Sequence, residues 1–126
     1  MKTDLPDVNV LVALHVDGHP HGDRARAWLV SAEGVVVTPL TQAGLRRMLL
    51  NPTINAGLAP AAANDVVADL LAVPGVVNWP DDTANVAKTP FMYALTGHRQ
   101  VSDLHLLSLA ASRGGRLVTF DKRIKA

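Results

Sequence analysis

Two patterns of apolar and polar positions alternate along the chain. Short apolar runs bounded by Gly, Pro or polar residues predict strands, and longer segments with helical spacing between caps and stops predict helices. Thr38 followed by Pro39 is a typical helix start, and Pro74 followed by Gly75 is a typical stop. The predicted strands are 3–6, 35–37, 76–79 and 117–120. The predicted helices are 8–14, 20–33, 39–50, 60–73, 90–96 and 102–113.

This order of elements predicts a parallel sheet with helices on both faces. Strands that alternate with helices of ten or more residues are joined by crossover connections, which make the strands parallel. A chain of 126 residues fits one domain, expected over residues 1–126. In such sheets the functional crevice lies beyond the carboxyl ends of the strands. Candidate residues are therefore expected at that edge.

Composition narrows the function classes. The chain is 48% hydrophobic and 18% charged, which excludes intrinsic disorder, and its net charge of +1 excludes nucleic-acid binding by bulk charge. The absence of cysteine excludes disulfides, cysteine nucleophiles and cysteine-ligated zinc. No apolar run reaches the length of a membrane span, and residues 1–7 contain no apolar segment typical of a secretory signal. The expectation is a cytoplasmic protein with no membrane partner.

Acidic and amide side chains follow the predicted strands or begin the helices after them. Asp7 follows the first strand, Gln42 lies on the first turns of the helix after the second, Asp103 lies at a helix start, and Asp121 follows the last strand. Converging carboxylates of this kind hold Mg²⁺ or Mn²⁺, which prefer hard oxygen ligands. Alone, Asp103 would be an ordinary helix-start residue and Asp121 a turn residue. Asp7 is different, because a carboxylate between apolar segments is costly without a partner.

One basic residue is expected near these acids. Arg46 lies four positions after Gln42 and therefore on the same helix face. If that face lines the acidic edge, Arg46 is placed to hold a scissile phosphate. The phosphate-binding glycine motifs and the G-x-S-x-G motif of serine hydrolases are both absent from the sequence.

Several short motifs occur in an order that is typical of one family. They are 5–11 (LPDVNVL), 19–21 (HPH), 41–46 (TQAGLR), 51–52 (NP), 79–82 (WPDD), 96–103 (TGHRQVSD) and 117–121 (LVTFD). Together they span nearly the whole chain, and they resemble the PIN-domain toxins of the VapC type. Because Gln42 stands where the general PIN pattern has Glu, the resemblance is to the T-Q-x-G subgroup, which shares the Gln.

The resemblance implies a three-layer α/β/α fold and a Mg²⁺-dependent endoribonuclease, with Mn²⁺ as a substitute, that is the toxin of a type II toxin–antitoxin pair. Asp7, Asp103 and Asp121 correspond to the metal-site acids of the family, and Asn9 and Thr119 to supporting polar positions. Its members continue into a further strand after the F-D segment, so that strand is expected to be missing here. The implied partners are a cognate antitoxin and an RNA substrate.

The resulting interpretation is a four-stranded parallel sheet in the order 3-2-1-4, with the first strand near the centre and an RNA-cleaving site at its carboxyl edge. Gln42 contributes its amide oxygen directly or through water. Apolar side chains on the predicted helix 60–73 favour a homodimer. Two alternatives stay open: a module that binds RNA or its antitoxin without cleaving, and a hydrolase of a phosphorylated small molecule.

Overall fold

The computed structural model describes residues 2–55, 57–81 and 101–120, and for residues 54, 55 and 101–103 it describes the backbone alone. The strands are β1 (Thr3–Pro6), β2 (Gly34–Val37), β3 (Val76–Asn78) and β4 (Arg116–Val118). The helices in the described ranges are α1 (Val8–His15), α2 (Gly22–Ser31), α3 (Pro39–Leu50), α4 (Pro52–Asn55), α5 (Pro60–Ala72) and α6 (Val101–Ser112). The predicted helix 90–96 lies outside the described residues.

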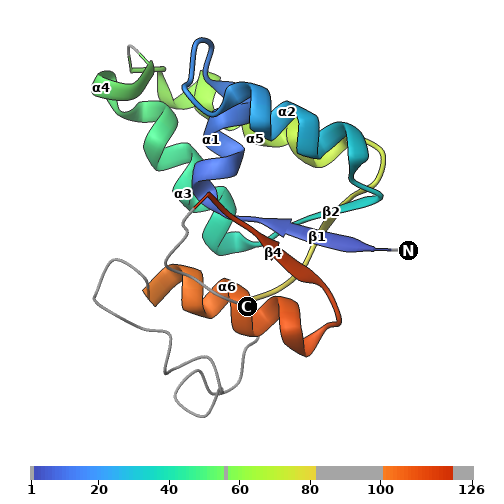
Figure 1. Ribbon diagram of the computed structural model, residues 1–126. Coiled ribbons are helices and arrows are strands. Elements are labelled where there is room, and N and C mark those ends of the chain that lie inside the picture. The colour runs from blue at the N-terminus through green and yellow to red at the C-terminus, as the bar shows by residue number, and fades with distance from the viewer. Residues whose placement is uncertain (1, 56, 82–100, 121–126) are drawn as a thin grey trace.

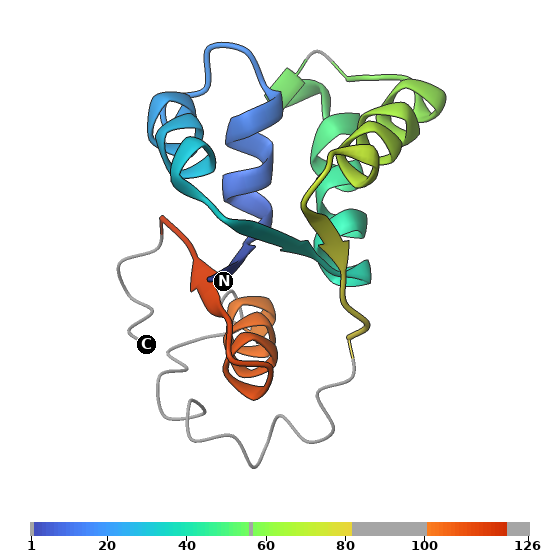
Figure 2. The ribbon, with the colours of Figure 1, turned by 90° about the vertical axis from the view of Figure 1, so that its right-hand side faces the viewer.

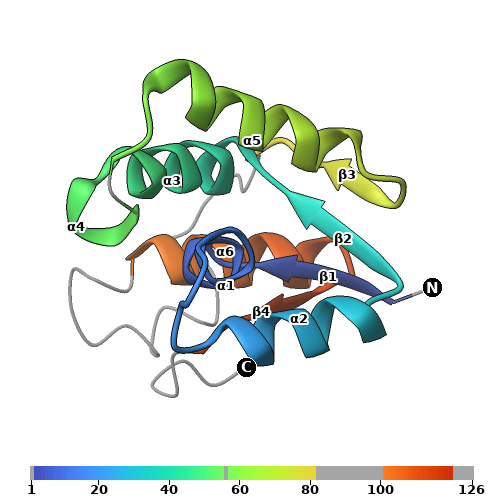
Figure 3. The ribbon, with the colours of Figure 1, turned by 90° about the horizontal axis from the view of Figure 1, so that it is seen from above.

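The four strands form one parallel sheet in the order β3-β2-β1-β4, which confirms the predicted topology (Figures 1 and 3). Asp4 is the register partner of both Val35 on β2 and Arg116 on β4. Pro6, the last residue of β1, is paired with Val118, the last residue of β4. The residues that follow these two strands, Asp7 and Thr119, therefore leave the sheet side by side.

Helices cover both faces of the sheet, as expected for a three-layer α/β/α fold. In Figures 1 and 2, α1, α2, α3 and α5 lie on one face and α6 lies on the other. Alternating side chains of β2 follow this division, because Val37 packs with α1, α3 and α5 whereas Val36 packs with α6. Both valines are buried, which explains why β2 reads as an uninterrupted apolar run in the sequence.

The boundaries of most elements agree with the sequence pattern to within one or two residues, and the exceptions have local causes. Helix α2 begins at Gly22 and not at Pro20, because the His21 N–H donates to His19 Nδ1 (3.0 Å) in a turn before the helix. The predicted helix 102–113 starts at Ser102, but α6 already includes Val101, so Ser102 lies inside the helix and is not its N-cap.

Helix α4 was not predicted. Asn51 followed by Pro52 was interpreted as the stop of α3, but the same pair is also a helix start. The side chain of Asn51 accepts hydrogen bonds from the backbone N–H of Thr53 (3.0 Å) and from its hydroxyl (2.8 Å). Asn51 thus ends one helix and caps the turn that follows.

Helix α5 buries more of its apolar face than the sequence suggested. Ala63 and Val67 are fully buried in the core with α1 and α3, and Val66 and Leu70 pack partly against the same core. Among the large side chains of α5, Leu71 keeps an exposed fraction of 39%. The apolar pattern that favoured a homodimer is therefore explained in large part by packing within one chain. No helix in the described ranges is long and apolar enough to cross a membrane.

A buried charge joins the edge strand to the sheet. Asp4, with 1% exposure, accepts hydrogen bonds from Arg116 Nε (2.6 Å) and Nη2 (3.1 Å) and from Trp28 Nε1 (2.7 Å). Burial by itself raises the pKa of Asp4, but the hydrogen bonds from Arg116 and Trp28 and the Arg116 charge outweigh it and hold that pKa below its ordinary value. Asp4 thus connects β1, β4 and α2.

Helices α1 and α3 approach closely at Gly44. A Cβ added to Gly44 would overlap with Cγ2 of Val8 and would lie 3.2 Å from its Cγ1, so the Val8 side chain or one of the helices would have to move. We expect Gly44→Ala to lower the free energy of unfolding by about 1–3 kcal/mol through overpacking. This loss outweighs the gain in unfolding free energy, up to ~1 kcal/mol, that replacing a helical glycine with alanine otherwise gives. Urea denaturation measures the difference.

The matched control for this prediction is Gly22→Ala in α2, where the nearest atom to an added Cβ is a guanidinium nitrogen of the exposed Arg26, at 3.1 Å. Because that side chain can move, no loss of stability is expected. The double variant Val8→Ala/Gly44→Ala should recover part of the loss seen in Gly44→Ala. Equal stability of Gly44→Ala and the parent would show that the helices separate without cost.

Candidate active site

Asp7 occupies the point where β1 ends and α1 begins. It is the N-cap of α1, and its Oδ1 accepts the backbone N–H of Val10 at 2.9 Å. Its backbone N–H donates to the carbonyl of Val118 on β4 at 3.0 Å, which fixes it to the carboxyl edge of the sheet. The residue has an exposed fraction of only 1%. A carboxylate is therefore held in a buried position at the place where α/β proteins bind ligands.

Thr119 contacts the same carboxylate from the neighbouring strand. Its hydroxyl donates to Asp7 Oδ2 at 2.6 Å, although 112 positions separate the two residues. The parallel pairing of β1 and β4 produces this contact, because it brings both strand ends to the same edge. Each oxygen of Asp7 thus accepts a hydrogen bond that orients it, Oδ1 from Val10 and Oδ2 from Thr119. The supporting position that the resemblance assigned to Thr119 coincides with this contact.

The other two predicted acids are placed only in part. Asp103 lies in the first turn of α6 as the structure describes it, and its side chain is outside the description. Asp121 follows the described residue Phe120 directly and lies outside the described ranges. Within those ranges no group of three or more His, Asp or Glu side chains is close enough to hold a metal ion. The convergence of Asp7, Asp103 and Asp121 stays a prediction.

A cavity of about 350 Å³ opens beside Asp7. It lies between the start of α1, one face of α3 and Leu106 of α6. Among the described residues, its polar lining consists of Asp7, Asn9 and Arg47. The other described lining residues are apolar or small: Val8, Leu40, Ala43, Gly44, Met48 and Leu106. A buried carboxylate, an amide and a cation thus border one cavity with an apolar wall.

The face of α3 that lines this cavity differs from the predicted one. Gln42 and Arg46 were expected there, but neither is among the lining residues. Gln42 Nε2 donates to Asn78 Oδ1 of β3 (2.8 Å), and Arg46 Nε donates to Asn64 Oδ1 of α5 (2.9 Å). Arg47, which the sequence analysis did not single out, lines the cavity instead. The signal for it was the spacing 40, 43, 44, 47, which follows one helix face.

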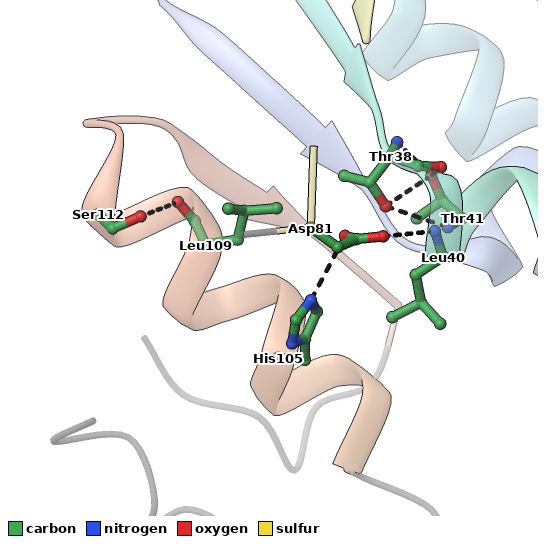
Figure 4. Close-up of polar contacts among 7 residues, drawn as sticks. All are labelled: Thr38, Leu40, Thr41, Asp81, His105, Leu109 and Ser112. Carbon is green, nitrogen blue, oxygen red and sulfur yellow. Dashed lines mark hydrogen bonds and ion pairs between the residues drawn. The ribbon is translucent and has the colours of Figure 1, made fainter. Parts of the chain in front are cut away.

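The start of α3 is fixed by two sets of hydrogen bonds. Thr38 and Thr41 form a capping box in which each side chain accepts the backbone N–H of the other residue, at 3.1 Å for Thr38 Oγ1 and 2.8 Å for Thr41 Oγ1. Asp81 adds a second acceptor, because its Oδ2 accepts the N–H of Leu40 at 2.7 Å (Figure 4). A carboxylate is favourable at this helix end, which carries partial positive charge.

Asp81 also reaches the helix on the other side of the sheet. Its Oδ1 lies 3.4 Å from Nε2 of His105 on α6, as Figure 4 shows. Both side chains are about one-fifth exposed. Since Leu40 of α3 and Leu106 of α6 both line the cavity, Asp81 connects two of its walls. The sequence analysis did not assign this role to Asp81, because its partners are distant in the sequence: Leu40 is 41 positions away and His105 is 24 positions away.

Comparisons with known proteins agree with this architecture. A PIN domain family model matches residues 5–126. The chain is 41% identical over 123 residues to Ribonuclease VapC39 of Mycobacterium tuberculosis, covering 94% of this chain and 88% of that protein. It is 42% identical over 120 residues to Ribonuclease VapC38 of the same organism, covering 93% and 84%, and 38% identical over 120 residues to Ribonuclease VapC29, covering 94% and 86%.

Proposed function

The chain belongs to the PIN-domain family and to its VapC type, and we propose from this that it is an endoribonuclease, the toxin of a type II toxin–antitoxin pair. The proposal is supported by relatives at about 40% identity that are named ribonucleases. The observation that carries it in this chain is the buried carboxylate of Asp7, which accepts hydrogen bonds from Val10 and Thr119 beside a cavity at the carboxyl edge of a parallel sheet.

The donor set at this edge fits a divalent cation. Asp7 presents a carboxylate whose oxygens are oriented by neutral N–H and O–H donors, and hard oxygen ligands of this kind suit Mg²⁺ and Mn²⁺. We propose that Asp7, Asp103 and Asp121 hold the metal, Mg²⁺ or Mn²⁺ in its place. When bound, the metal supplies a polarised phosphoryl oxygen and an attacking water of lowered pKa.

The remaining residues have supporting roles in this proposal. Thr119 orients Asp7 through its hydroxyl, and Asn9 offers an amide at the cavity edge. Gln42 stays in the proposed catalytic set as a prediction from the sequence; it does not line the cavity beside Asp7, and its Nε2 donates to Asn78 Oδ1, which leaves its amide oxygen as the atom that would contribute. Assignment to the T-Q-x-G subgroup stays a prediction.

The proposed partners are an RNA substrate and a cognate antitoxin, with residues 1–126 acting as one domain in the cytoplasm.

A homodimer is also proposed, supported by Val73 and Val77, which are 50% and 51% exposed at the end of α5 and on β3. Light scattering at high micromolar concentration tests it, and a monodisperse monomer would contradict it. The alternative of another class is a PIN-like module that binds RNA or the antitoxin without cleaving.

The experiment that tests the proposed function is incubation of the purified chain with a panel of labelled structured RNAs in Mg²⁺, in Mn²⁺ and in chelator. Endonucleolytic cleavage in either metal, and none in chelator, is the expected result. Binding without cleavage on every RNA would select the binding module. Cleavage that persists in chelator would contradict the metal-dependent mechanism.

A further inference from the structure

The cavity beside Asp7 has a cation on its rim that is not used in the fold. Arg47 is exposed and lines the cavity together with Asp7 and Asn9. Among the described residues, no hydrogen bond or ion pair involves Arg47, whereas the adjacent Arg46 is bonded to Asn64. The guanidinium of Arg47 is therefore available to a ligand. Guanidinium groups bind phosphate oxygens with two parallel hydrogen bonds, which makes an anion the natural ligand.

Most of the other described lining residues of the cavity are apolar and suit a different chemical group. Leu40, Ala43 and Met48 of α3 form an apolar wall that continues to Leu106 of α6. The volume of the cavity, about 350 Å³, lies within the range of small-molecule sites. A flat, largely apolar ring can pack against such a wall while a charged group stays at the rim. A nucleotide combines these two chemistries in one unit.

We propose that this cavity is a nucleotide subsite of the RNA-binding surface, in which Arg47 binds the phosphate next to the scissile one and the apolar wall receives the adjoining base. The inference rests on the proposed function, because it places the subsite next to the carboxylate that holds the metal. The sequence pattern placed Arg46 at the scissile phosphate; the proposal instead places Arg47 at the neighbouring phosphate. Asn9, on the same rim, supplies an amide that can hydrogen-bond to the phosphate or the sugar.

The test compares Arg47→Ala with Arg46→Ala, which removes the same charge from the same helix on its other face. Binding of a fluorescently labelled single-stranded RNA is measured by anisotropy in chelator over a range of salt concentrations. Arg47→Ala should weaken binding about tenfold and reduce the slope of log affinity against log salt by about 1, as expected for one lost phosphate contact. Arg46→Ala should change affinity by less than about twofold, since an exposed charge away from the ligand is screened.

A second variant tests the apolar wall. Ala43 is exposed on the helix surface, so Ala43→Leu can extend into the cavity without disturbing the core. It should weaken RNA binding about fivefold while leaving the salt slope unchanged, because it removes space and no charge. Kinetics in Mg²⁺ should show both effects mainly in KM. Melting temperatures within about 2 °C of the parent establish that both variants are folded.

The outcomes separate this inference from the proposed function. If the parent cleaves RNA in Mg²⁺ and Arg47→Ala matches Arg46→Ala in affinity and salt slope, the subsite is wrong and the nuclease assignment stands. If only Arg46→Ala weakened RNA binding, the phosphate contact would belong to Arg46 and not to Arg47, and the proposed subsite would be wrong. If the parent neither binds nor cleaves any RNA, the proposed function fails, and the subsite fails with it.

Discussion

Replacing Asp7 with Asn should abolish RNA cleavage while leaving the fold nearly unchanged. Asn is as good an N-cap as Asp, and its amide oxygen can still accept the Val10 N–H, so we expect a stability change within about 1 kcal/mol. The charge that binds the metal is lost, however. We expect the cleavage rate to fall about a thousandfold or more, equivalent to ~4 kcal/mol of transition-state stabilisation. Cleavage assays and thermal denaturation of the same preparation measure both effects.

The matched comparison is Thr119→Val, which keeps the carboxylate but removes the hydroxyl that orients it. Because Thr119 acts through Asp7, its loss should cost about 10–100-fold in rate, with KM for RNA unchanged and a higher Mg²⁺ requirement. Thr119→Ser should restore most of the activity. If Asp7→Asn cleaved RNA as fast as the parent, Asp7 would be only a helix cap.

Arg116→Ala should be the most destabilising of the surface arginine substitutions. Arg116 and Arg26 have side chains of similar exposure, 61% and 57%, and each pairs with one aspartate. Their partners differ, because Asp23 is 99% exposed whereas Asp4 is 1% exposed. Loss of Arg116 leaves a buried carboxylate whose remaining hydrogen bond from a described side chain is the one from Trp28 Nε1. We expect a melting temperature about 10 °C below that of the parent.

The control is Arg26→Ala, because its exposed pair with Asp23 should contribute almost nothing to the melting temperature.

The effect of Arg116→Ala should also depend on pH. The folded-state pKa of Asp4 is lowered, so its contribution is present above the ordinary aspartate pKa and is lost as the pH falls through the folded value. The difference in melting temperature between the parent and Arg116→Ala should therefore be largest at pH 7 and should decrease below about pH 4. A difference independent of pH would show that Arg116 stabilises the chain by packing alone.

The features that could be predicted from the sequence are those fixed by local signals. Thr38 and Pro39 mark the start of α3, and Pro74 and Gly75 mark the stop of α5, within one residue or so of the observed bounds. The alternation of strands and helices then restricts the sheet to parallel pairing, and family resemblance supplied the order. Asp7 stood out because a carboxylate between apolar segments requires partners, which Val10 and Thr119 provide.

The features that could not be predicted depend on contacts between distant segments. The pairs Gln42 with Arg46 and Ala43 with Arg47 are both spaced four residues apart, and a rotation of α3 by about 100° decides which pair meets the cavity. That rotation is set by the close approach of Gly44 to Val8, which no local pattern reveals. Two other contacts were missed because they also join distant segments. Asp81 and Leu40 are separated by 41 positions, and Asp4 and Arg116 by 112 positions.

The most direct test of the central claim is a calorimetric Mn²⁺ titration of the RNA-free chain, beside Asp7→Asn, Asp103→Asn and Asp121→Asn. The account predicts saturable binding by the parent and at least about tenfold weaker binding by each of the three variants, because each removes one charge from the same site. Asp17→Asn, at an exposed position before α2, should bind like the parent. Undiminished Mn²⁺ affinity in Asp7→Asn, or no binding by the parent at millimolar Mn²⁺, would contradict the account.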